Sequence, residues 1–293
     1  ITDSKIRQSE SIRKMLLATT EDIRVIIIKL ADRLDNMKSL KYFREDKQKR
    51  ISQETLDIYA PIAYRLGLSN IKWQLEDLAF RYLQPEIYQE FKEKVSQKRH
   101  EREIEISKIK SMLGKELKKN NIEAEIIGRP KNFYSTYKKM LNKNVDFDKV
   151  YDLIALRIIV NNVKECYEVL GIIHQLFKPL PQEFDDYIAN PKSNMYQSLH
   201  TVLIMPDEKN VEVQIRTKEM HKLAEEGIAA HWQYKGTQGD YRFDKKLSWL
   251  KQILNLKNEQ TNDFLEALKL DLFSDHIFVF TPKGDVIELP KDS

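Results

Sequence analysis

The hydrophobic pattern of this 293-residue chain changes at Asn120-Asn121, and the change requires two differently built parts. Before it, apolar residues recur every three or four positions, as at Ile23, Ile27 and Leu30, which predicts amphipathic helices. After it, short apolar or alternating runs are separated by helical stretches, which predicts strands that alternate with helices. We therefore expect an α+β multidomain protein in which an all-α part precedes a mixed sheet with helical cover.

The second part divides into segments that can be placed individually. A last pair of strands is expected near the end of the chain, joined by the turn 281–285. Pro61 predicts a bend or a new helix start in the first part. The expected strands are 122–128, 153–160, 198–205 and 210–217, and the expected helices are 130–141, 163–177 and 218–235.

Composition limits the classes of partner and compartment. The net charge of +4 and the pI of 8.8 suit phosphate-bearing ligands without requiring nucleic acid. Cys166 is the single cysteine, which excludes a disulfide framework and indicates a reducing, cytoplasmic setting. No apolar run approaches the roughly 20 residues of a membrane-spanning helix. The chain begins without Met inside a helical pattern, so we expect a fragment of a longer protein.

Basic residues gather at the start of the helix expected at 130–141. Arg129 and Lys131 lie where the chain enters this helix, and Ser135 and Lys139 follow Lys131 at steps of four. Cations, a hydroxyl group and a helix N-terminus together make a plausible polyphosphate cradle. A basic surface helix explains the same residues equally well.

The strand 210–217 alternates Val211, Val213 and Ile215 with polar residues, so one face belongs to the core. A half-exposed strand explains this pattern on its own. Asp152 precedes the strand that contains Arg157, and an Asp there is often only a turn former. If Asp152 meets Glu212 from a neighbouring strand, the two carboxylates could instead hold Mg²⁺ over phosphate oxygens.

The loop 178–200 combines acids, a lone lysine, an aromatic ring and a histidine. Phosphates need cations, magnesium needs carboxylates, and a flat base needs a ring for stacking. A nucleotide is the ligand class that uses all three. The residues concerned are Glu183, Asp185, Asp186, Lys192, Tyr196 and His200.

Several long motifs in this sequence resemble those of one known enzyme family. GRPKNFYSTYKKM, YDLIALR, EFDDYIANPKSNMYQSLHT, VEVQIRTKEMH and AEEGIAAHW, in this order, resemble the synthetase domain of the long Rel/RelA/SpoT stringent-response enzymes. IRVIIIKLADRLDNM and YAPIAYRLGLSNIKWQLEDLAFRYL resemble the later part of their HD-type hydrolase domain and its connector, and HIFVFTPKGDVIELP resembles the opening of their TGS domain. The implied division is a partial hydrolase domain at 1–68, a connector at 69–120, a nucleotidyltransferase-like synthetase domain at 121–240, a linker at 241–274 and a TGS start at 275–293.

The resemblance implies a reaction and a set of roles. The family's synthetase transfers pyrophosphate from ATP to the ribose 3′-hydroxyl of GDP or GTP, giving AMP and (p)ppGpp. Arg129, Lys131, Ser135 and Lys139 would bind ATP, with Arg157 nearby; Asp152 would hold Mg²⁺, and Glu212 would share the metal or accept the proton of the 3′-hydroxyl. Tyr196 would stack on guanine, with Asn194, Lys192, His200, Gln214 and Arg216 around the acceptor.

Two features of the acceptor loop bear on which family members this chain resembles: its acidic motif is similar to that of synthetase-specialised RelA enzymes, and one residue departs from the family pattern. Glu183, Asp185 and Asp186 form the acidic version of a motif that is basic in bifunctional enzymes, and this motif would tune acceptor choice and metal use. The family has Gly before the stacking tyrosine, where this chain has Met195. If that position requires a positive φ, Met195 strains the loop by roughly 1–3 kcal/mol.

The hydrolase of this family holds Mn²⁺ with a His, a His-Asp pair and a later Asp. Asp32, with Asn36 nearby, matches the later part, whereas the first histidine of this sequence is His100. Asp32 could equally be a solvated acid paired with Lys29 or Arg33. The resemblance also implies ribosome and uncharged tRNA as partners through further regions. A catalytically silent, guanine-nucleotide-binding homologue and a nucleic-acid-binding protein are the alternative functions.

Overall fold

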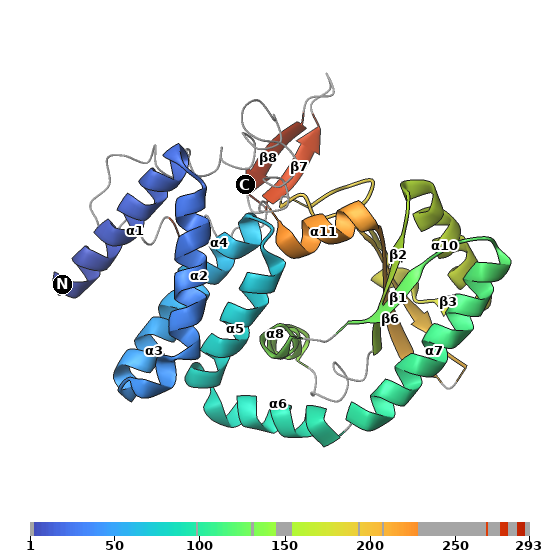
Figure 1. The fold of residues 1–293 in the computed structure, drawn as a ribbon, viewed down its shortest axis with the longest axis horizontal. Helices are drawn as coiled ribbons and strands as arrows, with labels where there is room; N and C mark the ends of the chain where they lie inside the picture. Colours follow the sequence, from blue (N-terminus) through green and yellow to red (C-terminus); the bar gives the residue numbers. More distant parts are fainter. Residues whose placement is uncertain are drawn as a thin grey trace.

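The protein has a helical part followed by a sheet part in the computed structural model, which describes residues 3–97, 99–129, 132–144, 154–192, 194–206, 208–227, 268, 276–280 and 286–290 (Figure 1). The helical part contains α1 (Asp3–Glu21), α2 (Arg24–Lys38), the 3-10 turn η1 (Leu40–Tyr42), α3 (Glu45–Glu54), the π-helical turn η2 (Thr55–Tyr59), α4 (Ala60–Arg65), α5 (Ser69–Leu83), α6 (Pro85–Gln97) and α7 (Arg99–Lys119). Within the described ranges, no helix is both long and apolar enough to cross a membrane.

The apolar stripe predicted for the first part forms the core between α1, α2, α4 and α5. Ile23, Leu30 and Met37 are buried, and Ile27 and Leu34 pack against them. The α-helical geometry resumes at α4, which carries a proline in its first turn, where a missing N–H is tolerated. Residues 45–65 are helical throughout, so Pro61 lies just after the change from π-helical to α-helical geometry and not at a separate helix start.

The sheet part contains the mixed sheet that the sequence predicts. Its elements are β1 (Glu125–Gly128), α8 (Phe133–Lys143), β2 (Ile154–Val160), α10 (Val163–Leu176), β3 (Lys178–Pro179), η3 (Pro181–Glu183), β4 (Asp185–Asp186), β5 (Leu199–Ile204), β6 (Asn210–Thr217) and α11 (Lys218–Glu226). The strand order is β1-β2-β6-β5-β3, with β4 also paired to β5. The pair β2-β6 is parallel, and the other pairs of this sheet are antiparallel.

Some predicted bounds differ from the observed ones. The first strand starts at Glu125 rather than at 122. The helix expected at 218–235 ends at Glu226, because Gly227 adopts a positive φ of 56°; residues 228–235 lie outside the described ranges. The last two strands, β7 (His276–Phe280) and β8 (Val286–Pro290), form a separate antiparallel pair, as expected.

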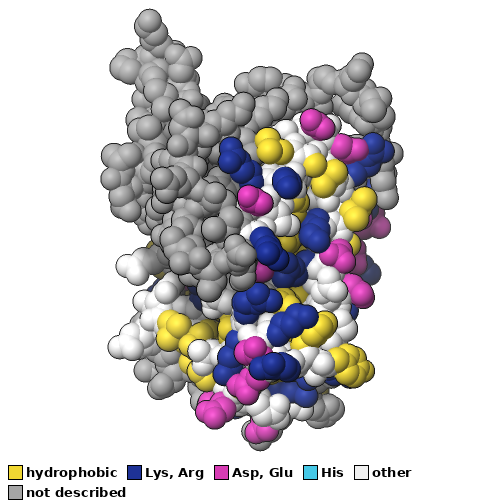
Figure 2. Space-filling view, turned by 90° about the vertical axis from the view of Figure 1, so that its left-hand side faces the viewer, with side chains coloured by type: hydrophobic (Ala, Val, Ile, Leu, Met, Phe, Trp, Pro, Cys, Tyr) yellow, Lys and Arg dark blue, Asp and Glu magenta, His cyan; other side chains and the backbone are white. Residues whose placement is uncertain are grey.

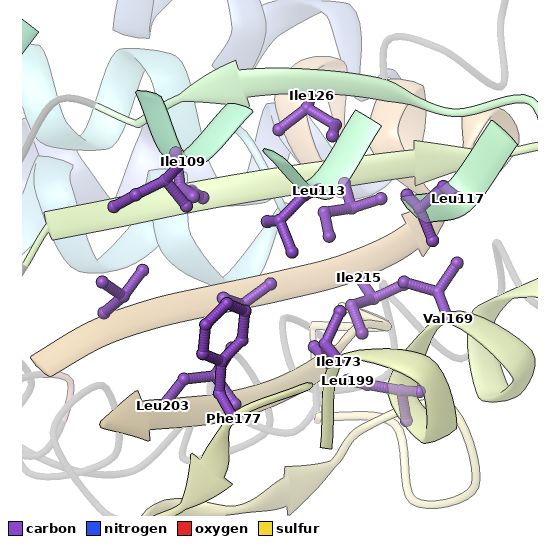
Figure 3. Close-up of a cluster of buried hydrophobic side chains, with 14 of the residues drawn as sticks. Ile109, Leu113, Leu117, Ile126, Val169, Ile173, Phe177, Leu199, Leu203 and Ile215 are labelled. Atoms are coloured by element: carbon purple, nitrogen blue, oxygen red, sulfur yellow. The ribbon is translucent and has the colours of Figure 1, made fainter. Parts of the chain in front are cut away.

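Helices α7 and α10 cover one face of the sheet. Figure 3 shows Ile109 and Leu113 of α7 and Ile173 of α10 packed against Leu199 and Ile215 of the strands. The connector predicted at 69–120 is therefore divided, because its first helix, α5, packs into the helical core and α7 packs into the sheet core. Helices α8 and α11 lie on the other side of the sheet, between it and α5 (Figure 1).

Candidate functional site

The polar face of β6 is buried, which corrects the interpretation as a half-exposed strand. Gln214 and Arg216 expose only 3% and 1% of their surface, and the Glu212 side chain exposes 15%. The alternation itself is confirmed, because Val211, Val213 and Ile215 lie in the core. Charged groups on a covered face need partners, since burial without them is costly. The contacts of this face therefore define the candidate site.

Glu212 and Arg129 meet across three strands. The N–H of Arg129 donates to the carbonyl of Ala155 at 2.8 Å, and Ala155 lies opposite Glu212 in the β2-β6 register. This places Arg129 Nη1 3.2 Å from Glu212 Oε1, which also accepts a bond from Gln214 Nε2 at 3.3 Å. Asp152, the predicted partner of Glu212, lies outside the described residues, so that pairing stays a prediction.

A single carboxylate on α11 holds two arginines of the sheet. Glu225 Oε1 accepts from Arg157 Nη1 at 2.8 Å and from Arg216 Nη2 at 3.2 Å. His221 Nδ1 lies 2.7 Å from the same Arg216 nitrogen. Burial lowers the pKa of Arg157, and it lowers the pKa of Arg216 to about 10, so Arg216 stays charged at neutral pH.

Three buried polar atoms of this face have no hydrogen-bond partner in the described part of the chain. They are Nε of Arg157, Oε1 of Gln214 and Nε of Arg216. Native proteins rarely leave buried polar atoms unsatisfied, so these atoms need a partner that the described residues do not supply, such as an ordered water or a ligand. Two cationic donors and one amide acceptor suit a polar, anionic ligand.

An aromatic cluster with a lysine adjoins this face. Tyr196 Oη lies 2.9 Å from His200 Nε2, and their rings are nearly perpendicular at 82°. Lys192 Nζ lies 4.2 Å from the ring centre of Tyr187 and 5.8 Å from that of Tyr196. Burial lowers the pKa of His200 to about 4, so this ring is neutral at pH 7. Tyr196 is partly buried and keeps some exposed surface.

The side chains predicted to bind ATP affect the pKa of Lys192, which is predicted to lie at the acceptor. Burial lowers the pKa of Lys192, the positive charges of Arg129, Lys139 and Lys72 lower it further, and Asp185 opposes them. Lys139 belongs to α8 and Arg129 follows β1, whereas Lys192 belongs to the acceptor loop. Arg129 and Lys139 therefore lie close enough to Lys192 for their charges to affect its pKa.

Asp186 shapes the backbone of the acidic motif, and the motif's expected role in metal use stays a prediction. Its Oδ1 accepts the N–H groups of Ile188 and Ala189, and its Oδ2 accepts from Tyr167 Oη. Asp185 lies opposite His200 in the β4-β5 register and is exposed, as is Glu183. Of the three acids, Asp186 is thus an Asx-turn former.

The side chain of Asn194 also forms its hydrogen bonds with backbone groups. The residue is 6% exposed; its Nδ2 donates to the carbonyl of Tyr64 at 3.2 Å, and its Oδ1 accepts from the N–H of Tyr196 at 3.1 Å. Asn194 therefore holds the backbone of Tyr196, and its predicted contact with the acceptor stays a prediction. Met195 between them has a φ of 66°, which meets the condition for strain stated from the sequence.

The N-terminus of α8 is already occupied, which corrects the proposed use of its amides as a phosphate cradle. Asp77 of α5 accepts from the N–H of Tyr134 at 2.9 Å and from that of Phe133 at 3.4 Å. Asn132 Oδ1 accepts from the N–H of Ser135 at 2.7 Å. These three amides are therefore already hydrogen-bonded within the protein, and Lys131 lies outside the described residues.

The helical part shows no complete metal site in its described residues. Asp32 pairs with Lys29 at 3.1 Å and its side chain is 51% exposed, whereas Arg33 pairs with Glu54; Asn36 is exposed. No group of three or more His, Cys, Asp or Glu residues that could hold a metal occurs in the described ranges. On the side of the molecule shown in Figure 2, Lys and Arg side chains alternate with Asp and Glu side chains, and no histidine is visible among the described residues. Asp32 thus makes the Lys29 contact that the solvated-acid alternative expects, and its metal role stays a prediction.

Sequence reasoning missed several residues of the site. Glu225 lies four residues after His221 on α11, a spacing that places both side chains on one helix face and could have indicated them. Tyr187 stands among the loop acids without a distinguishing pattern. Asp77 and Tyr64 had no local signal, because their partners are far away in the sequence.

Two family models match the chain. The region found in RelA/SpoT proteins matches residues 128–239, and an HD domain model matches residues 2–69. Neither matched segment includes β7 or β8, so the comparisons give no support for the predicted TGS start.

Three relatives extend over nearly the whole chain. A GTP pyrophosphokinase of Myxococcus xanthus is 50% identical over 288 residues, which are 97% of this chain and 38% of that protein. A guanosine-3′,5′-bis(diphosphate) 3′-pyrophosphohydrolase of Aquifex aeolicus is 50% identical over 293 residues, 99% of this chain and 42% of that protein. A bifunctional (p)ppGpp synthase/hydrolase RelA of Mycobacterium tuberculosis is 42% identical over 297 residues, 98% of this chain and 40% of that protein.

Among solved structures, a GTP pyrophosphokinase family protein from Streptococcus pneumoniae matches 62% of this chain and 97% of its own, with 24% identity and a TM-score of 0.38. The chain spans between 38% and 42% of the length of the three relatives above. The order of an HD domain and a RelA/SpoT region agrees with the two parts of the fold and with the motifs of the site. The chain belongs to the RelA/SpoT family.

Proposed function

We propose that this chain carries the synthetase of a stringent-response enzyme, which transfers pyrophosphate from ATP to the 3′-hydroxyl of GDP or GTP. The observation that carries the proposal is the Glu212–Arg129 contact on a buried polar face, beside the Tyr196–His200 pair and Lys192. Relatives named GTP pyrophosphokinase support the same reaction. No observation favours the catalytically silent alternative.

The transfer needs a deprotonated acceptor and stabilised phosphate charge. The 3′-oxygen attacks the β-phosphorus of ATP, the bond from that phosphorus to the α,β-bridging oxygen breaks, and AMP leaves with the bond's electrons. Glu212 would accept the proton of the 3′-hydroxyl, a role that contributes roughly 10²–10⁴-fold to such reactions. Arg129, Lys139 and Arg157 would bind the triphosphate, and Tyr196 would stack on the guanine.

A divalent metal ion fits the donor set of this face. Magnesium prefers carboxylate oxygens, which Glu212 and the predicted partner Asp152 would supply. When bound, Mg²⁺ would neutralise negative charge on the phosphate oxygens. The side chains of Ser135, Gln214 and Arg216 would complete the walls of the two nucleotide subsites.

A second activity is proposed for the complete protein only. The HD domain match and the relatives named pyrophosphohydrolase or bifunctional favour (p)ppGpp hydrolysis with Mn²⁺, to which Asp32 would contribute. We also propose a cytoplasmic location, where ATP and GTP are available, and association with ribosome and tRNA through further regions.

The test of the synthetase is a turnover assay with γ-labelled ATP and GDP. The expected result is AMP release together with labelled guanosine product, and Glu212→Gln lowers the rate about 10²–10⁴-fold. Glu219→Gln, an exposed acid at the start of α11, is the matched control and keeps the rate. Tight binding of GDP without any AMP release contradicts the proposal and supports the silent homologue.

A further inference from the structure

Asp77 belongs to the helical part, yet its carboxylate is used by the sheet part. It accepts hydrogen bonds from the first two N–H groups of α8, those of Phe133 and Tyr134. These N–H groups have no partner within their own helix, because the first turn of an α-helix leaves its donors unpaired. A carboxylate also interacts favourably with the positive end of the helix dipole. Asp77 thus acts as a cap supplied by another helix.

A second contact joins the same two helices one turn away. Asn132 Nδ2 donates to the carbonyl of Trp73 at 3.0 Å, while Asn132 Oδ1 caps Ser135. Trp73 precedes Asp77 by one helical turn, so the start of α8 is bound to α5 at two successive turns. The position of α8 along α5 is therefore fixed by polar contacts with defined directions.

Aromatic packing fixes the rotation of α8 about its own axis. The rings of Phe80 on α5 and Tyr137 on α8 are stacked at 4.9 Å with an interplanar angle of 23°. Tyr134 lies 5.8 Å from Phe80, and Phe91 of α6 lies 6.3 Å from Tyr137. With this face packed against α5 and α6, Lys139 is displayed on another part of the helix surface.

We propose that Asp77 is a positioning residue for the triphosphate of the donor nucleotide. This inference rests on the proposed function, in which α8 presents Ser135 and Lys139 to ATP. Asp77 binds no nucleotide itself; it holds the helix whose side chains do. Because Asp77 and Asn132 occupy the amides at the start of α8, they also prevent the triphosphate from binding there and leave it to the side chains.

The acceptor loop provides an internal contrast. Asn194 of that loop donates to the carbonyl of Tyr64 at the end of α4, so the neighbouring segment of the helical part holds the other subsite. Loss of the Asp77 contact should affect ATP alone, and loss of the Asn194 contact should affect GDP alone. A general loss of folding would affect both nucleotides together.

The experiment compares the purified chain with Asp77→Asn and Asp77→Ala, measuring the Kd of ATP and of GDP by calorimetric titration and the Tm of each variant. Asp77→Asn is expected to weaken ATP binding about five- to thirtyfold, because the amide keeps only one acceptor oxygen for the two N–H groups at the start of α8, with the Kd of GDP unchanged. Asp77→Ala weakens ATP further, since it removes both acceptor oxygens. Asn194→Ala shows the opposite selectivity. Asp46→Asn, an exposed acid in the first turn of α3, is the matched control.

Hydrogen exchange at Phe133 and Tyr134 reports the contact without any nucleotide. Faster exchange there together with weaker ATP binding supports the inference. An unchanged Kd of ATP in Asp77→Asn overturns it, as does an equal loss for ATP and GDP with a lowered Tm. Failure of the proposed function is seen separately, as a wild-type chain that binds both nucleotides but releases no AMP.

Discussion

Met195 shows how a single backbone angle can oppose the residue type that occupies it. Its φ of 66° lies in the left-handed region, and its N–H donates to the carbonyl of Lys192 at 2.7 Å to close the turn before Tyr196. A Cβ in this region costs roughly 1–2 kcal/mol. The chain retains the turn because Asn194 and the following strand hold it on both sides.

Replacing Met195 by glycine is expected to stabilise the fold by about 0.5–1 kcal/mol. The relief of roughly 1–2 kcal/mol of strain exceeds the extra flexibility of glycine in the unfolded chain, which costs roughly 0.5–1 kcal/mol. Urea denaturation measures the change. Met195→Ala keeps the Cβ and should show no gain, so an equal gain with alanine would assign the effect to the side chain instead of the backbone.

Glu225 should prove more important than its position on the surface of α11 suggests. Glu225→Gln leaves Arg157 and Arg216 with a neutral partner, so we expect a loss of about 1–3 kcal/mol. The lower end applies, because the Glu225 side chain is 36% exposed and solvent screens part of the interaction. Urea denaturation of both variants measures the loss. The control is the adjacent Glu226→Gln, which is expected to change stability by less than about 0.5 kcal/mol. Equal losses in both variants would contradict the pairing.

Sequence motifs could identify the reactive and charged residues that lie together in short segments of the chain. Arg129, Lys192, Tyr196, His200 and Glu212 were named from the chain and lie near one another in the structure. Residues that hold them were not identified when the partner lies far along the chain, as with Asp77, which is 57 positions from Tyr134. Local patterns carry no information about such contacts.

At the level of elements, β6 shows what alternation can and cannot predict. The period of two correctly assigned its apolar face to the core, since that property depends on the strand alone. Whether the opposite face meets solvent depends on what lies over it, and α11 with its Glu225 covers Arg216. The pattern therefore predicted the strand and its core face but not the burial of the site.

The sequence likewise predicted helix α8 and its position. It did not predict that Asp77 accepts hydrogen bonds from the first N–H groups of this helix. The pKa of Asp77 is raised to about 6, chiefly by burial, while the N–H groups of Tyr134 and Phe133 act in the opposite direction. Glu76 also raises it and Lys72 lowers it. The remaining ionisable neighbour is on α6, where Tyr88 has its own pKa raised by burial and by the Asp77 charge.

This shift predicts a pH dependence whose sign is opposite to that of an ordinary salt-bridged acid. The native state binds the Asp77 proton more tightly than the unfolded chain, so its contribution to stability is complete below pH 3.8 and is lost as the pH rises through about 6. The free energy of unfolding of the wild type relative to Asp77→Asn should fall by about 1–3 kcal/mol between pH 4 and pH 7. Urea titrations at several pH values measure the difference, in which the other carboxylates cancel. A constant difference contradicts the burial of the charge.

At the scale of the whole molecule, two glycines bring the helical part and the sheet part into backbone contact. Gly67, between α4 and α5, and Gly227, after α11, both have positive φ values, of 73° and 56°. A Cβ on Gly227 would lie 2.4 Å from the carbonyl carbon of Gly67. A Cβ on Gly67 would lie 3.6 Å from the carbonyl oxygen of Asn194 in the acceptor loop. The junction therefore adjoins the acceptor loop.

Gly227→Ala should consequently disturb both folding and the acceptor side of the site. The left-handed backbone and the clash with Gly67 together are expected to cost about 3 kcal/mol or more, measured by urea denaturation. The affinity for GDP should fall more than that for ATP, since the displaced backbone adjoins Asn194 and not α8. Gly114→Ala is the matched control: this glycine is in α7 with open space around it, so alanine should stabilise the helix by about 0.5–1 kcal/mol. If both substitutions behaved alike, the close approach of the two parts at Gly67 and Gly227 would not exist in solution.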